Sequence, residues 1–201
     1  IQQYAFRDCY NLEEVTVGTM GGNLNDEAFG YCSALKKVVF SQGPVRIGTR
    51  VFVYSDALET FIAGEGNREV AQDAFIAVKL FPEYNWGFIQ WVEKPIDRIS
   101  LSKVVLPQST EAIGKNAFAR CTAMSNFAMP QGVTTIGTSA FSKCQALERI
   151  SIPDGVTHIP NQAFEGCSAL KDVSLSNNVT TIGGHAFNGC STLKNVNFSD
   201  N

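Results

Sequence analysis

The sequence predicts an α/β solenoid built from 23-residue units, and three observations support this fold class. Phenylalanines recur every 23 residues, the residues around them repeat in fixed columns, and each unit changes from a three-residue to a two-residue apolar period. One unit of this length cannot bury its apolar side alone, so neighbouring units must stack into a single array. The Phe column consists of Phe6, Phe29, Phe52, Phe75, Phe118, Phe141, Phe164 and Phe187.

Each unit combines a turn with a strand. In one unit the apolar column residues Phe164, Cys167 and Leu170 are three residues apart, which predicts a short helical or 3₁₀ turn with one buried stripe. From Leu170 to Leu175 (LKDVSL) the period shortens to two and predicts a short strand. Glycine and proline mark the bends between them. The glycines of the bend before each turn are Gly48, Gly114, Gly137 and Gly183.

The interval between Phe75 and Phe118 breaks the period, because it spans 43 residues. Leu101, Val104 and Leu106 restore the apolar columns within it. We interpret the interval as one degenerate unit followed by one shortened unit. Residues 1–201 are then a single solenoid with a degenerate, aromatic-rich segment at 76–100.

The units IPDGVTHIPNQAFEGCSALKDVSL and LSNNVTTIGGHAFNGCSTLKNVNF illustrate a pattern of Ile-Gly, Ala-Phe, Cys and Leu-x-x-Val-x-Leu. This pattern resembles the BspA-type leucine-rich repeat, and it covers nearly the whole chain apart from residues 76–100. The resemblance implies a leucine-rich-repeat solenoid in a cell-surface or secreted protein of host-associated bacteria, with relatives in some protists. It implies adhesion to host matrix proteins, other microbes or neighbouring cells, and it implies no catalytic residue. Both ends fall inside a unit, so we expect a fragment of a longer protein.

Composition and spacing favour a non-enzymatic protein without cofactor or metal. The net charge of −3 gives no basic excess for nucleic acid, and no apolar run approaches the ~20 residues of a transmembrane helix. No two cysteines have the close spacing of zinc ligands, so we expect a buried ladder of free thiols. His158 and His185 occupy different columns, and a solvent-facing position is expected for both. The cysteines are Cys9, Cys32, Cys121, Cys144, Cys167 and Cys190.

A partner-binding patch is predicted around the segment that breaks the repeat. Val39, Ile62 and Val105 share an outward-facing strand column, and Trp86 and Trp91 lie in the adjoining segment. Exposed apolar groups with a polar rim often mark an interaction site. The alternative is structural, because valine and isoleucine favour strands and large aromatic side chains are usually mostly buried.

The resemblance implies protein–protein adhesion outside the cell, and together with this patch it leads us to expect an adhesive monomer with a host matrix or cell-surface protein as partner. Two alternatives stay open. The array can be a spacer that presents another domain, or a carbohydrate-binding module that uses Tyr84, Trp86 or Trp91.

Overall fold

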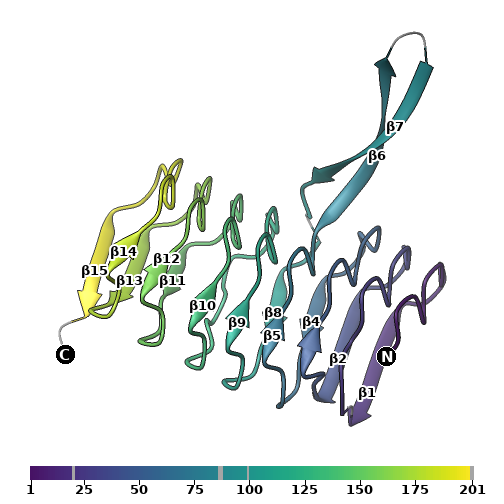
Figure 1. Cartoon of the computed structure of the whole chain (residues 1–201), viewed down its shortest axis with the longest axis horizontal. Helices are drawn as coiled ribbons and strands as arrows, with labels where there is room; N and C mark the ends of the chain where they lie inside the picture. Colours follow the sequence, from purple (N-terminus) through teal and green to yellow (C-terminus); the bar gives the residue numbers. More distant parts are fainter. Residues whose placement is uncertain (20, 86–87, 99, 200–201) are drawn as a thin grey trace.

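The computed structural model describes residues 1–19, 21–85, 88–98 and 100–199. The chain winds into coils that stack along one axis, with its termini at opposite ends (Figure 1). Every regular element in the described residues is a β-strand. The predicted α/β class is therefore wrong in its helical part, whereas the predicted solenoid and its column of short parallel strands are observed.

The longest strands of the coils pair in parallel on one side of the solenoid. The first sheet has the order β1-β2-β4-β8, and β11-β13-β15 continue the same column further along the array. Inward and outward residues alternate, so that Val38 and Phe40 of β2 are buried between exposed or half-buried neighbours. The strands are β1 (Glu14–Thr19), β2 (Lys37–Gln42), β4 (Thr60–Ile62), β8 (Lys103–Val105), β11 (Arg149–Ser151), β13 (Asp172–Ser176) and β15 (Asn195–Ser199).

Two-residue strands form a second parallel ladder, and the glycine column follows it directly. A Cβ atom added at Gly137 would lie 2.3 Å from the backbone nitrogen of Lys115, and one at Gly114 would lie 2.5 Å from that of Gln72. The glycines are therefore required because backbones of adjacent coils meet there. These strands are β3 (Arg46–Ile47), β5 (Glu69–Val70), β9 (Ala112–Ile113), β10 (Thr135–Ile136), β12 (His158–Ile159) and β14 (Thr181–Ile182).

The segment around each Phe is a succession of turns, and the predicted short helical turn is absent from it. The residue two before each Phe has positive φ in all eight coils, and the residue two after it does so in seven. Left-handed residues at this spacing interrupt a right-handed helix, and they direct backbone N–H groups toward the next coil. Phe118 N, for example, donates to Ala140 O of the next coil at 2.9 Å. The first set is Tyr4, Glu27, Arg50, Asp73, Asn116, Ser139, Gln162 and His185.

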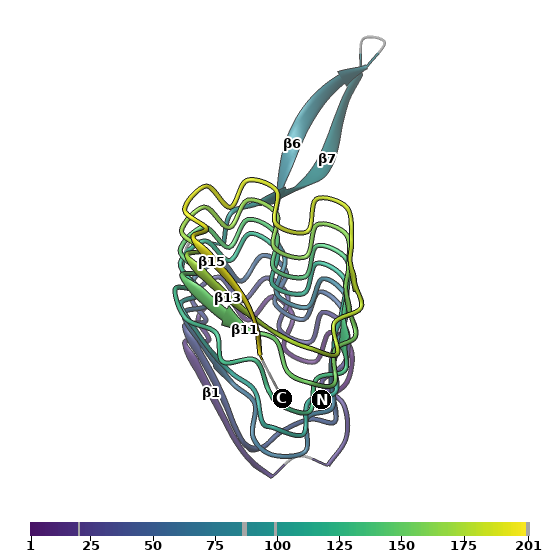
Figure 2. The same ribbon diagram turned by 90° about the vertical axis from the view of Figure 1, so that its left-hand side faces the viewer.

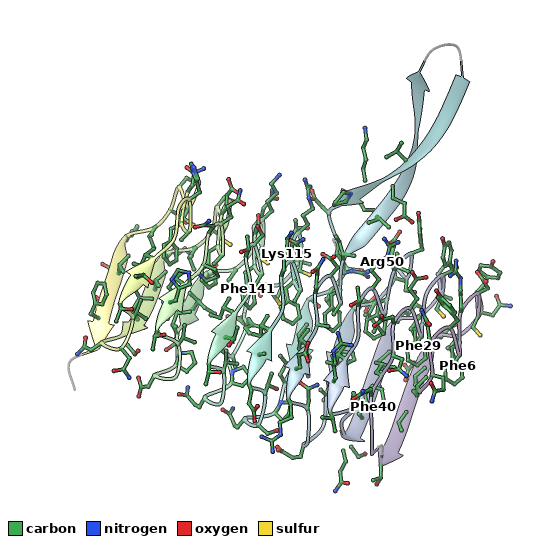
Figure 3. All side chains as sticks on the ribbon, viewed as in Figure 1. Phe6, Phe29, Phe40, Arg50, Lys115 and Phe141 are labelled. Carbon is green, nitrogen blue, oxygen red and sulfur yellow. The ribbon has the colours of Figure 1, made fainter. Side chains whose placement is uncertain are left out.

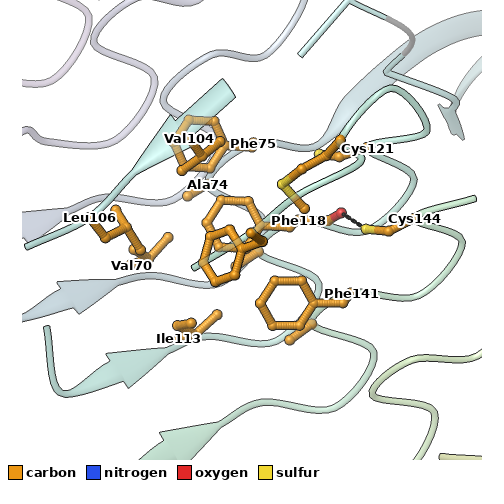
Figure 4. Packing of buried hydrophobic residues seen from close by; sticks show 14 of the residues in the cluster. Val70, Ala74, Phe75, Val104, Leu106, Ile113, Phe118, Cys121, Phe141 and Cys144 are labelled. Carbon is orange, nitrogen blue, oxygen red and sulfur yellow. Dashed lines mark hydrogen bonds between the residues drawn. The ribbon is translucent and has the colours of Figure 1, made fainter. Parts of the chain in front are cut away.

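A continuous core runs through the coils and is organised by the Phe column. The rings of Phe75, Phe118 and Phe141 stack with centroid separations of 5.1 and 5.4 Å (Figure 4). The Phe side chains from Phe29 to Phe164 are fully buried, whereas Phe6 at the first coil is 39% exposed. Each interior Phe is therefore covered by the coils on both sides.

An antiparallel hairpin, β6 (Ala77–Asn85) and β7 (Phe88–Ile96), leaves the solenoid and projects away from it (Figures 1 and 2). The coils before and after it are direct neighbours, because Thr60 of β4 pairs with Lys103 of β8. The prediction of one degenerate and one shortened unit is therefore wrong. The irregular interval inserts the hairpin into a single coil, whose remainder resumes at Arg98.

Candidate binding surfaces and the base of the hairpin

The structure places the three predicted strand residues side by side. Val39 pairs with Ile62, and Ile62 pairs with Val105, so the side chains form a row across β2, β4 and β8. Val39 and Ile62 are half-buried, and Val105 is 42% exposed. We call Val39, Ile62 and Val105 the apolar row.

Charged and polar residues lie beside the apolar row. The neighbouring outward column contains Glu14, Lys37, Thr60 and Lys103, which are paired in register. Lys37 Nζ lies 3.3 Å from Glu14 Oε2. An apolar strip with a polar margin is the arrangement that commonly marks a protein-interaction surface.

The structure does not place the two predicted tryptophans beside the apolar row. Trp91 belongs to β7, where it pairs with Pro82, and its side chain, like that of Tyr84, lies outside the described side chains. Trp86 lies outside the described residues. Figure 2 shows β7 rising away from the long strands of the coils. The structure therefore brings together three of the five predicted residues.

A polar groove lies over the sheet β11-β13-β15, toward the C-terminal end of the array. It has a volume of about 620 Å³. Arg149 Nε lies 3.2 Å from Asp172 Oδ2, and Asn195 Nδ2 donates to Asp172 Oδ1 at 2.7 Å. The outward column that contains the apolar row thus becomes polar further along the array, at Ser151, Ser174 and Asn197. The groove is lined by Asn126, Phe127, Ala128, Arg149, Ile150, Ser151, Asp172, Ser174 and Asn197.

The cysteine column forms a ladder of side-chain donors inside the turns. Cys144 Sγ donates to Phe118 O at 3.2 Å (Figure 4). Cys167 Sγ donates in the same way to Phe141 O at 3.1 Å. Ser55 occupies this column in its coil and donates to Phe29 O at 2.6 Å. The side chain therefore satisfies the Phe carbonyl of the preceding coil, in addition to filling space.

The thiols are free, as expected, and their environment suppresses ionisation. Burial raises the pKa of Cys121 to about 12, although the nearby Arg98 opposes this effect. Burial also raises the pKa of Cys32 to about 11. Because the thiolate is the reactive form, these cysteines are poor nucleophiles and poor metal ligands. In the described residues, no three His, Cys, Asp or Glu side chains come together as a metal site.

Arg98 takes the place of the thiol in the coil that contains the hairpin. Counting 23 residues on from Ser55 gives Val78 for this column, but Val78 belongs to β6. Arg98 Nη2 donates to Phe52 O at 2.9 Å, and this is the carbonyl that a cysteine would reach from the same column. The signal in the sequence is that Arg98 lies three residues before Leu101, as Cys121 lies three before Met124.

Arg98 is almost fully buried and ties the stems of the hairpin to the core. Its side chain is 1% exposed. It donates to Phe75 O at 2.8 Å and Ser55 O at 2.8 Å, besides Phe52 O and the longer contact with Ile76 O. Burial lowers the pKa of the guanidinium, which nevertheless stays charged at neutral pH. Four carbonyl acceptors thus compensate for the desolvation of this cation.

A surface network holds β7 against the turns of the third coil. Arg50 Nη2 lies 2.8 and 3.0 Å from the two carboxylate oxygens of Glu93, and Tyr54 OH donates to Glu93 at 2.9 Å. Burial alone would raise the pKa of Glu93, but the hydrogen bonds from Arg50 and Tyr54 outweigh it and lower that pKa. Figure 3 shows Arg50 close to the base of the hairpin. We call these three residues the Glu93 brace.

Contacts on either side extend the brace. The Tyr54 ring stacks on Tyr31 at 4.4 Å, and the guanidinium of Arg7 lies 4.7 Å from the centre of the Tyr31 ring. On the other side of the stem, Arg120 Nη1 lies 2.9 Å from Asp97 Oδ1. The base of the hairpin is therefore fixed from the core and from both flanks.

The described part of the chain holds no helix that is long and apolar enough to span a membrane. No curated protein matches the sequence significantly.

Solved structures show the same fold. A leucine-rich repeat protein of T. pallidum superposes with a TM-score of 0.71 at 23% identity, covering 90% of this chain and 79% of that one. A leucine rich cell surface protein of Faecalibacterium prausnitzii gives 0.60 at 22% identity, covering 98% of this chain and 62% of that one. The pneumococcal vaccine antigen PcpA gives 0.54 at 16% identity, covering 94% of this chain and 57% of that one.

The family comparison follows the boundaries of the solenoid. The model of the BspA type leucine rich repeat region matches residues 1–80 and 97–201 in six copies, and it leaves out most of the hairpin. With its repeat columns, its parallel strand ladder and this match, the chain belongs to the BspA-type leucine-rich repeat family.

Proposed function

We propose that this chain is a protein-binding repeat module that acts outside the cell, and that it adheres to a host matrix or cell-surface protein. The observation that carries the proposal is the apolar row, where Val39, Ile62 and Val105 lie in register on an outward-facing parallel sheet. Family membership supports a protein-interaction role, since solenoids offer long surfaces to partners. The extracellular setting is supported by the similarity to a bacterial cell surface protein and to a vaccine antigen.

The apolar row is suited to the centre of an interface. Three branched side chains in one line lose little conformational entropy on binding, because their χ1 angles are already restricted. The neighbouring outward column, which contains the ion pair Glu14–Lys37 together with Thr60 and Lys103, supplies a polar rim. Charge signs mix along this rim, so affinity is expected to depend on apolar contact more than on salt.

Biolayer interferometry of the chain against a panel of matrix proteins and glycans tests the proposal. A variant with Val39, Ile62 and Val105 all changed to Ser should fold and lose saturable binding to one protein of the panel. The matched control changes Val45 and Val196 to Ser, because these exposed valines lie outside the row. Circular dichroism checks that both variants keep the fold.

Other outcomes separate the alternatives. Saturable protein binding that survives the triple change would exclude the apolar row as the contact surface. Binding to a glycan that depends on Arg149 and Asp172 would assign function to the polar groove instead. Binding to no member of the panel would favour the spacer role.

A further inference from the structure

The hairpin has two free edges, and the positions of its prolines distinguish them. Its sheet consists of β6 and β7 alone, so within the described residues neither outer edge pairs with another strand. In an antiparallel pair, every second residue directs its N–H and C=O groups outward. Proline has no N–H, so it is accommodated where that group would point away from the partner strand.

Both prolines of the hairpin lie at pairs of the same type, because hydrogen-bonded and non-hydrogen-bonded pairs alternate along an antiparallel ladder. Pro82 pairs with Trp91, and Pro95 pairs with Val78, and the two pairs are four positions apart along the ladder. We infer that these are outward-facing positions, together with Leu80, Tyr84, Ile89 and Glu93. Along β6 the outward row is interrupted in its middle by Pro82. Along β7 it runs without interruption through Ile89, Trp91 and Glu93.

We propose that two copies of this chain pair through the free edge of β7. Antiparallel pairing around a two-fold axis at Trp91 places Trp91 opposite its equivalent and Ile89 opposite Glu93 of the second copy. The same patch then serves both copies, as a closed two-fold interface requires. The result is a four-stranded sheet of order β6-β7-β7-β6, in which each Trp91 exchanges two backbone hydrogen bonds.

Charge and geometry favour a second copy as the occupant of this edge. The segment Phe88–Val92 carries no charge, and in the two-fold register no like charges stand opposite each other. The hairpin projects away from the coils, and antiparallel pairing places the two solenoids at opposite ends of the new sheet (Figures 1 and 2). Arg98 and the Glu93 brace hold the base of the hairpin, which lowers the entropy that pairing must overcome.

This inference goes beyond the proposed function, because it uses a surface other than the apolar row. A monomer is expected from the sequence, and the uninterrupted edge of β7 is the feature that changes this expectation. Loss of pairing and loss of adhesion are therefore separable. The triple serine variant should still pair, and an edge variant should still bind the adhesion partner.

Sedimentation equilibrium over a wide range of protein concentration tests the pairing. The wild-type chain should show a reversible monomer–dimer equilibrium. Trp91→Pro removes the central N–H from the β7 edge at an outward position, so it should weaken the dimer at least about tenfold, since two hydrogen bonds are lost. Trp91→Ala keeps the N–H and should keep the dimer. Leu80→Pro makes the equivalent change on the β6 edge and should also leave the dimer intact.

Amide exchange measured by NMR at low and high concentration gives a readout that needs no variant. The amides of Ile89, Trp91 and Glu93 should gain protection as concentration rises, whereas those of Leu80 and Tyr84 should not. A wild-type chain that stays monomeric throughout would overturn the proposal. So would a dimer that survives Trp91→Pro, or one that is abolished by Leu80→Pro.

Discussion

The regular coils and the coil that carries the hairpin use different side chains to donate to the Phe carbonyl of the preceding coil. In a regular coil, a cysteine such as Cys144 satisfies the Phe carbonyl of the preceding coil and fills the space beside it. In the hairpin coil the same position holds Arg98, which satisfies that carbonyl and three others. The longer side chain thus joins the turns of the third coil to the backbone at Phe75 and Ile76, where the hairpin begins.

In this chain, the exit of the insertion carries a buried donor, while the packing of the core stays the same. Phe75 and Phe118 stack across the hairpin at 5.1 Å, within the range of the rings in regular coils. The core is therefore continuous through the insertion. What changes is the hydrogen bonding of the turns, and this is where substitutions should distinguish the two kinds of coil.

The largest effect is expected from removing a Phe ring. Phe164→Ala in a regular coil and Phe75→Ala in the hairpin coil should each lower the free energy of unfolding by about 3–5 kcal/mol, through the cavity left behind. Urea titration followed by circular dichroism measures both. Similar losses mean that the hairpin leaves the core unbroken, and a loss below about 1 kcal/mol for Phe75→Ala would show that it does not.

Arg98 provides the direct contrast between the coils. Arg98→Met keeps an apolar stem but removes the side-chain hydrogen bonds to four buried carbonyls, so it should cost about 3 kcal/mol or more of unfolding free energy. Phe52 O and Ser55 O still accept the backbone N–H groups of Ser55 and Leu58. Arg98→Cys supplies the donor of a regular coil, and it should restore the side-chain bond to Phe52 O and part of the stability. Equal stability of the two variants would contradict the view that this side-chain bond stabilises the coil.

Thiol reactivity tests the regular coils. Because burial raises the pKa of Cys121 to about 12 and that of Cys190 to about 11, little thiolate exists at pH 8. Reaction with a disulfide reagent in the native state should be more than about a hundredfold slower for these residues than in the unfolded chain. Unfolding without reductant should release six reactive thiols per chain. Fewer than six would indicate disulfides.

The smallest effect on global stability is expected at the surface brace. Glu93→Gln should cost at most about 1 kcal/mol, because the ion pair with Arg50 is partly exposed. Amide exchange in β7 should nevertheless accelerate, since the side chain that holds this strand is weakened. The matched change Glu111→Gln, at the exposed pair with Arg68, should leave β7 unaffected.

The brace also predicts a pH dependence. The pKa of Glu93 is lower in the folded chain than the ordinary value of 4.5. Its stabilising contribution is therefore complete above that ordinary value, and it is lost as the pH falls through the lower folded pKa. Exchange in β7 should accelerate across this acidic window in the wild type, relative to the same measurement on Glu93→Gln. Identical pH profiles would contradict this.

The periodic part of the fold could be predicted because its signal repeats. The Phe, Cys, Leu and Gly columns each report the same packing constraint in coil after coil. The helical turn was predicted wrongly, because a three-residue apolar spacing fits a helix as well as a succession of turns. Residues such as Asn116 and Arg120 adopt positive φ because the adjacent coil binds their backbones, and side-chain spacing carries no trace of this.

The hairpin and its anchoring were missed for a different reason. A single insertion has no repeat against which to align it, so the 23-residue spacing from Ser55 points to Val78 for the position that Arg98 occupies. Glu93 contacts Tyr54 and Arg50, which precede it by 39 and 43 residues. Arg98 contacts Ser55 and Phe52, which precede it by 43 and 46 residues. Contacts at such a distance become visible only once the coils are stacked.

By itself, the sequence determined the solenoid, its 23-residue coil, its buried columns and the family, because each feature follows from local periodicity and from the burial that stacking imposes. It also determined which strand residues face outward, including the apolar row. Only the tertiary structure decided that the aromatic segment leaves the array as a hairpin and that a buried cation holds it there. These depend on which backbone groups remain unsatisfied when coils meet, and that is a property of the assembled chain.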